Sequence, residues 1–118
     1  MVQYSDNLDE TFTALGDPTR RGILEHLGRG AASISDLGSE FEMSLTGIKK
    51  HVRILEEVGL VVTEKTGRVR TCRLGQRRLD AEQAWMDMYH MYLKMLDERL
   101  DHLARFLDHT KGEANEHQ

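Results

Sequence analysis

Apolar residues recur at spacings of three and four along most of the chain, which is the periodicity of helices that bury one face. The first apolar stripe lies between Ser5, which can cap a helix, and Gly16, which ends it. Its members are Leu8, Phe12 and Leu15. The next stretch, DPTRRGILEHLG, begins with a suitable N-cap at Asp17 and the only proline, Pro18, at the first helical position. We predict a second helix here, with its isoleucine and leucines buried and its end at Gly28.

Two further helices are predicted after a turn at residues 29–33. Ser35 can cap a short helix, SDLGSEF, that turns Leu37 and Phe41 inward. Ser44 can cap a longer helix that runs to about Val58. Two short helices joined by a tight turn are typical of a helix-turn-helix.

The period changes in the stretch LVVTEKTGRVRTCRL. Its β-branched residues on both sides of KTG predict a two-stranded hairpin with its tip near Thr66 and Gly67. Asp80 and Gln83 then have capping-box spacing and open a long helix. The apolar stripe of that helix contains Trp85, Met88, Tyr92, Leu96, Leu100, Leu103 and Leu107. The order of elements predicts a mainly α chain with a small β-hairpin, which is a winged helix-turn-helix with an additional helix at each end.

The helix that starts at Ser44 has an apolar side and a basic side. At about 100° per residue its aliphatic residues fall together, whereas Lys49, Lys50 and Arg53 fall on the opposite side. The cations gather in the first turns, where the helix dipole also favours anions. A helix that enters the major groove of DNA needs this arrangement. The candidates for contact with bases are Ser44, Thr46, Gly47, Lys49, Lys50 and Arg53.

The predicted hairpin is basic as well. Lys65, Arg68 and Arg70 lie on it and are candidates for contact with the phosphate backbone or the minor groove. The chain as a whole is acidic, with a formal net charge of −4, because acidic residues gather near its start and in its last helix. Such a division of charge along the chain is typical of a protein with one nucleic-acid-binding face.

The length of 118 residues fits one domain, in which we expect a winged-helix core at about 8–78, a long helix at about 80–110 and a loose polar tail at 112–118. The single cysteine, Cys72, excludes a disulfide within the chain and favours the cytoplasm. The sequence has no membrane-spanning run and no secretory signal. It also has no nucleophile–base pair and no cofactor fingerprint, so we expect neither an enzyme nor a cofactor.

The two end helices carry more apolar surface than one winged domain can cover. We therefore expect a twofold homodimer in which these stripes pack against each other. The expected interface residues are Leu8, Phe12, Leu15, Leu96, Leu100, Leu103 and Leu107.

The segments LGDPTRRGILEHL, SISDLGSEF, SLTGIKKHVRILEEVGLV and GRVRTCRL together resemble the ArsR/SmtB family of bacterial winged-helix regulators. The resemblance covers roughly residues 8–74, and the long last helix is similar to that of a subgroup without an obvious metal site. It implies a homodimer, built by the first and last helices, that binds an imperfect inverted repeat in a promoter. It also implies repression of transcription and release of DNA when a small-molecule inducer binds.

Metal sensing, known in that family, has little support in this chain. The segment SDLGSEF lacks the cysteine pair of one family site. Asp87, His90, His102 and His109 do not have the spacing of the other family site, so we expect no metal site.

Other chemical roles remain as alternatives. Cys72, between Arg70 and Arg73, could sense oxidants, but strand alternation places it with Leu74 on the inner face of the hairpin, which favours a structural role. The Trp, Met and Tyr residues of the last helix fit an effector pocket or, more simply, an interface. A metal- or thiol-responsive repressor, and a winged helix that binds protein and not DNA, are the alternatives to a DNA-binding repressor.

Overall fold

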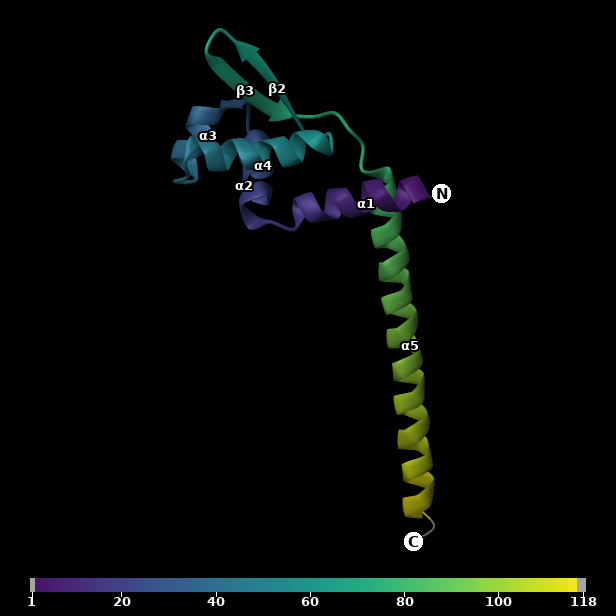
Figure 1. Cartoon of the computed structure of the whole chain (residues 1–118). Helices are drawn as coiled ribbons and strands as arrows, with labels where there is room; N and C mark the ends of the chain where they lie inside the picture. Colours follow the sequence, from purple (N-terminus) through teal and green to yellow (C-terminus); the bar gives the residue numbers. More distant parts are fainter. Residues whose placement is uncertain (1, 117–118) are drawn as a thin grey trace. The chain divides into compact units, whose positions relative to one another are not determined.

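The chain forms two units, Met1–Leu79 and Asp80–Gln118 (Figure 1). The computed structural model describes residues 2–116, and the side chains of residues 8–110. The first unit contains α1 (Val2–Leu15), α2 (Pro18–Leu27), β1 (Ala32–Ser33), α3 (Ile34–Glu40), α4 (Leu45–Glu57), β2 (Val61–Thr66) and β3 (Val69–Leu74). The second unit is one helix, α5 (Asp80–Glu116). The first unit has the predicted winged helix-turn-helix order, with the β2–β3 hairpin, hereafter the wing, next to α4.

Side-chain caps define where the helices of the first unit begin. Asp17 accepts a hydrogen bond from the backbone N–H of Arg20 at 3.0 Å, with Pro18 in the first turn, which confirms the predicted start of α2. The predicted start of α3 is wrong by two residues, because Ser33 and not Ser35 caps it. The start of α1 is also wrong, since the helix begins at Val2 and contains residue 5.

The sheet has one strand that the sequence did not predict. Residues 29–33 were expected to form only a turn, but Ala32 and Ser33 form β1 and pair with Cys72 and Thr71 of β3. The strand order is β1-β3-β2, all antiparallel. The wing itself is as predicted: its strands join through a two-residue turn that begins at Gly67, whose φ of 63° suits a glycine.

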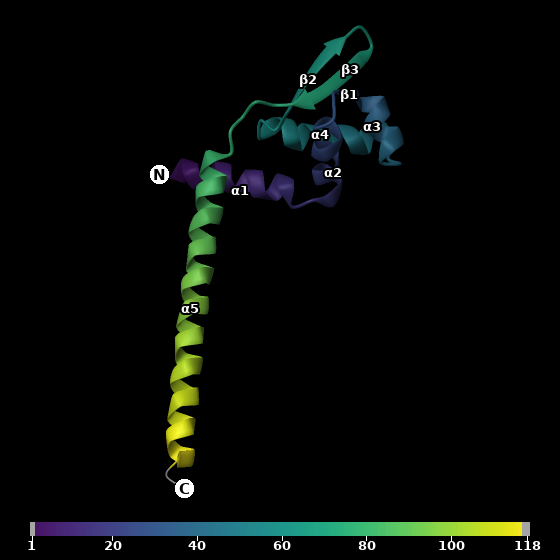
Figure 2. The same ribbon diagram turned by 180° about the vertical axis from the view of Figure 1, so that it is seen from behind.

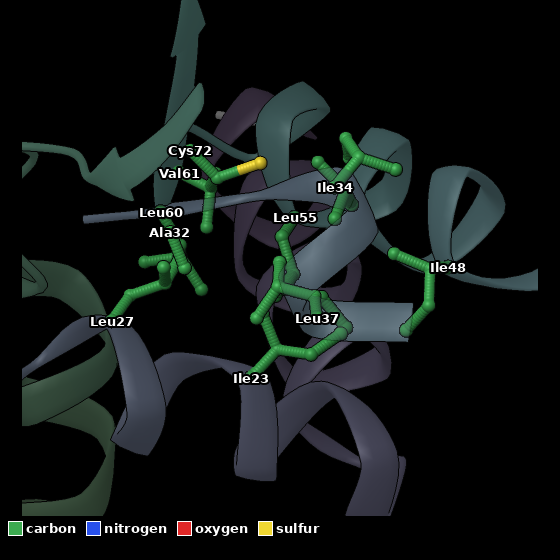
Figure 3. Packing of buried hydrophobic residues seen from close by; sticks show 12 residues of the cluster. Ile23, Leu27, Ala32, Ile34, Leu37, Ile48, Leu55, Leu60, Val61 and Cys72 are labelled. Carbon is green, nitrogen blue, oxygen red and sulfur yellow. The ribbon is translucent and has the colours of Figure 1, made fainter. Parts of the chain in front are cut away.

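One apolar core holds the first unit together. Ile23 of α2, Leu37 of α3 and Leu55 of α4 point toward one another (Figure 3). Cys72 closes the core from the wing and is fully buried, as strand alternation predicts. Leu74 was expected to lie with it but is 41% exposed, at the last position of β3. In both views α4 lies between the wing and α2 (Figures 1 and 2).

The second unit is a single unbroken helix. It has 37 residues and therefore a length of roughly 55 Å at 1.5 Å per residue. The predicted end at about residue 110 is wrong, because residues 112–116, which were expected to form a loose tail, continue the helix. Its first helical residue is Asp80. No helix in the described part of the chain combines the length and the apolar character needed to cross a membrane.

Candidate nucleic-acid interface

The two sides of α4 differ in burial as the sequence predicts. Ile48, Val52 and Leu55 are buried in the core, whereas the basic side chains on the other side are exposed. The exposed cations are Lys49, Lys50 and Arg53. The first turn of α4 is capped by Ser44, whose Oγ accepts a hydrogen bond from the backbone N–H of Gly47 at 3.1 Å. The helix therefore presents a capped N-terminus and a cationic face to solvent.

A basic hollow lies where α4 meets the wing. It has a volume of about 380 Å³ and combines Lys49 of α4 with the three cations predicted on the wing. These three are Lys65, Arg68 and Arg70, all exposed. The remaining lining residues come from β1, α3, α4 and β3, and none of the side chains that the structure places around the hollow is acidic. The wing and α4 thus join into one positive surface.

A second hollow of about 280 Å³ lies between α4 and the wing, and its lining includes the carboxylate of Glu56. Arg70 donates from Nη1 to the hydroxyl of Thr63 at 2.9 Å, and that hydroxyl donates to Oε2 of Glu56 at 2.7 Å. Lys49 and Arg53 line the same hollow. The charge of Arg70 is therefore partly directed toward α4, a constraint that the sequence did not reveal.

Other predicted contact residues lie outside the basic hollow. Thr46 and Lys50 are exposed on α4 but do not line it, and Arg53 lines only the second hollow. A Cβ on Gly47 would lie 3.1 Å from Cε of Met43 and 3.4 Å from Oγ of Ser44. This crowding supports close local packing as a reason for the glycine.

Arg20 connects α1, α2 and α4, a role that the sequence did not reveal. Its guanidinium donates to the carbonyl oxygens of Ala14 at 2.8 Å and Thr13 at 3.0 Å, and it contacts Nδ1 of His51 at 3.2 Å. The hydrogen bond from the backbone N–H of Arg20 lowers the pKa of Asp17, desolvation opposes this effect, and the guanidinium charge of Arg20 lowers the pKa further. His51 is half-buried on α4, and its contact with Arg20 gives it a structural role. The Asp-Pro-Thr-Arg segment pointed to a structured helix start, but it did not identify His51 as the partner of Arg20.

Cys72 has the properties of an inert thiol. Burial raises its pKa, the carboxylate of Glu56 raises it further, and Arg70 lowers it less. A buried thiol that resists deprotonation is a poor nucleophile and a poor oxidant sensor. Among the described residues, no group of three His, Cys, Asp or Glu side chains is placed to hold a metal ion.

Comparison with known proteins defines the class of protein. The model of a helix-turn-helix domain matches residues 15–64, the segment that contains α2, α3, α4 and the start of the wing. With this domain, the wing and the basic face of α4, the chain is a winged helix-turn-helix transcriptional regulator. It is 40% identical to an ArsR family transcriptional regulator of known crystal structure, with a TM-score of 0.70, over 80% of this chain and 97% of that one. The chain belongs to the ArsR family, so it is a regulator of transcription and not an enzyme.

Two further comparisons concern a repressor with a similar sequence and a solved structure with a similar fold. The chain is 29% identical over 79 residues to the transcriptional repressor SdpR of Bacillus subtilis, which covers 67% of this chain and 88% of SdpR. It shares its fold with a homodimeric winged helix-turn-helix DNA-binding domain of Mb0332 from Mycobacterium bovis. That domain is 22% identical with a TM-score of 0.59, over 86% of this chain and 88% of the domain.

Proposed function

We propose that the protein is a homodimeric repressor that binds an inverted repeat in double-stranded promoter DNA through α4 and the wing. The observation that carries this proposal is the basic hollow, in which Lys49 of α4 lies beside three cations of the wing. A duplex that followed this surface would meet cations from both elements at once. The repressor activity of the relative SdpR supports the direction of regulation.

The two elements have different parts in this proposal. The first turns of α4 enter the major groove, where side chains read base edges, while the wing lies along the phosphate backbone or the minor groove. The proposed base contacts are Ser44, Thr46, Gly47, Lys49, Lys50 and Arg53. The proposed phosphate or minor-groove contacts are Lys65, Arg68 and Arg70. Ser44 acts mainly by capping α4, because its Oγ already accepts a hydrogen bond from the helix.

The proposed dimer rests on the exposed apolar side chains of α5. Every described residue from 83 to 110 is exposed, and the apolar ones include leucines that are more than half exposed. These are Leu96, Leu100, Leu103 and Leu107, which helical spacing places in one stripe. Monomers rarely expose a continuous apolar stripe of this extent, so a second copy of the chain is the proposed partner. The homodimeric state of the Mb0332 domain supports it.

The α1 part of the proposed interface is less exposed. Leu8, Phe12 and Leu15 are partly buried, and Leu15 packs against the core of its own unit. These three residues therefore offer a second copy less apolar surface than α5 does. We infer that α5 contributes most of the interface.

The proposed setting of the protein is the cytoplasm, and we propose that a small-molecule inducer releases it from DNA.

Selection of bound sequences from random duplexes tests the proposal. We expect an inverted repeat whose half-sites lie about 34 Å apart, one turn of DNA. The replacement Lys49→Ala should then lower affinity for that repeat by about 1–3 kcal/mol if Lys49 reads a base. The matched control is Lys94→Ala, an exposed lysine of α5 that helical spacing puts opposite the apolar stripe. A wild type that binds no duplex better than random DNA would favour the alternative of a protein-binding winged helix.

A further inference from the structure

The side chain of Arg20, on α2, makes contacts with both α1 and α4. Its guanidinium donates from Nε to the carbonyl of Ala14 and from Nη2 to the carbonyl of Thr13, two acceptors at the C-terminal end of α1. From Nη1 it reaches Nδ1 of His51 on α4, 31 residues away in the sequence. Asp17, 3.8 Å from the same ring nitrogen, completes the group. A single side chain thereby joins the end of α1 to the middle of α4.

The contact with His51 has a defined direction. A guanidinium only donates hydrogen bonds, so Nδ1 of His51 accepts and the ring proton lies on Nε2. The side chain of His51 is 19% exposed, so the ring has little freedom to turn away. The planar guanidinium fixes three bonds in one plane, which fixes the position of the imidazole relative to the end of α1.

The place of His51 in α4 gives this contact its consequence. His51 lies two residues from both Lys49 and Arg53 in α4. His51 is half-buried, whereas Lys49 and Arg53 are exposed. The aliphatic residues of α4 hold the helix in the core, but apolar packing is not directional. A hydrogen bond to the ring from Arg20 of α2, which is itself bonded to the end of α1, can set the rotation of α4 about its axis.

We propose that Arg20 is a positioning residue for DNA recognition, which acts by holding His51 and so directs the basic face of α4. This inference rests on the proposed function, because it assigns α4 to the major groove. The same guanidinium holds the end of α1, whose apolar stripe is part of the proposed dimer interface. The orientation of each recognition helix is thereby tied to the dimer, which a repeat with fixed half-site spacing requires.

Two replacements of His51 separate positioning from a merely structural role. His51→Asn puts an amide oxygen near the place of Nδ1 and can still accept a hydrogen bond from Arg20, whereas His51→Leu fills the site without an acceptor. Neither adds a charge, so the attraction to phosphates is unchanged. Leucine is the better helix former and the more favourable residue to bury, so stability alone should favour His51→Leu. If His51 positions α4 for DNA recognition, His51→Asn should bind the repeat more tightly than His51→Leu.

The experiment compares both variants and the wild type on the selected inverted repeat and on a random duplex, at one salt concentration, by fluorescence anisotropy. We expect His51→Asn to bind the repeat within about twofold of the wild type, and His51→Leu to bind it about tenfold more weakly, the factor of one hydrogen bond to a charged group. Affinity for the random duplex should stay the same in all three. Arg20→Lys keeps the charge but cannot make the three planar bonds, and should lose preference for the repeat as His51→Leu does.

The outcomes that overturn the inference are distinct from failure of the proposed function. Equal binding of the repeat by His51→Leu and His51→Asn, with a wild type that prefers the repeat, overturns the positioning role alone. A parallel loss on the repeat and the random duplex, together with a lower thermal stability, also overturns it, because that is the result of a damaged fold. A wild type without any preference overturns the proposed function and this inference with it.

Discussion

Replacing Arg68 by alanine should change the salt dependence of DNA binding by an amount that can be calculated. Arg68 lies in the two-residue turn at the tip of the wing, is exposed, and lines the basic hollow with Lys49. In the described part of the structure no acidic side chain pairs with it. Its charge is therefore available to a phosphate, and Arg68→Ala removes one such contact from each protomer.

The magnitude follows from counterion release. The slope of log affinity against log salt is about −0.9 for each phosphate neutralised, so two lost contacts per dimer should make the slope shallower by about 1.8. Over a fourfold change in salt, from about 50 to about 200 mM, this amounts to roughly a tenfold change in the ratio of wild-type to variant affinity. The defect of Arg68→Ala should thus be large at low salt and small at high salt. It should be similar for the selected repeat and for random DNA, because a phosphate contact carries no sequence information.

Fluorescence anisotropy with a labelled duplex at four or more salt concentrations measures this slope. The matched control is Arg105→Ala, which makes the same change in net charge on the side of α5 opposite the apolar stripe. Its slope should equal that of the wild type. Equal changes of slope in both variants would mean that net charge acts at long range and that Arg68 makes no contact. An unchanged slope in Arg68→Ala would remove the wing tip from the interface.

Three further predictions concern the dimer, the loss of folding stability at acidic pH and the reactivity of Cys72. Leu100→Glu should place a charge in the apolar stripe of α5 and convert the dimer to a monomer in light scattering at micromolar concentration; a dimer of unchanged affinity would contradict the proposed interface. The pKa of Asp17 is lowered in the folded state by the backbone N–H of Arg20, so its contribution to stability is present above the unfolded pKa and is lost as pH falls through the folded pKa. Asp17→Asn keeps a cap and should flatten the pH dependence of urea unfolding in that acidic range, and a curve parallel to that of the wild type would refute the assignment. Cys72 should react with a thiol reagent in urea but not in the native protein, and fast native reaction would revive the thiol-sensor alternative.

Features that depend on a few neighbouring residues were predictable from the sequence. The caps at Asp17 and Ser44 satisfy backbone N–H groups three residues away, so composition and spacing are sufficient to find them. The turn at Gly67 is equally local, because a two-residue hairpin turn needs a positive φ at its first position. The basic and apolar sides of α4 follow from helical periodicity alone.

Features that depend on distant partners were not predictable. β1 has only two residues and exists because it pairs with β3, some 40 residues later, so no local pattern announces it. The hydrogen bonds that link Arg70 through Thr63 to Glu56, and the one between Arg20 and His51, depend on how α4 packs against its neighbours. Periodicity assigned these residues to faces of their elements but could not choose their partners. The length of α5 was underestimated because the polar segment after residue 110 has no apolar stripe to mark it.

The exposed stripe of α5 also bears on how tightly the proposed dimer would hold and on how it would respond to DNA. Each of its four leucines is about half exposed, and covering half of a leucine side chain contributes roughly 1 kcal/mol. Eight such side chains in a twofold dimer give roughly 8 kcal/mol, close to the free energy of a micromolar dissociation constant, before the entropy of association is subtracted. These leucines alone therefore give a weak dimer, and the aromatic and methionine side chains nearer the start of α5 must supply the rest. An inverted repeat binds only when both recognition helices are present, so DNA should stabilise the dimer by mass action. A substitution in α5 would then weaken operator binding most at low protein concentration, where the dimer is scarce, whereas a substitution in the basic hollow would weaken it at every concentration.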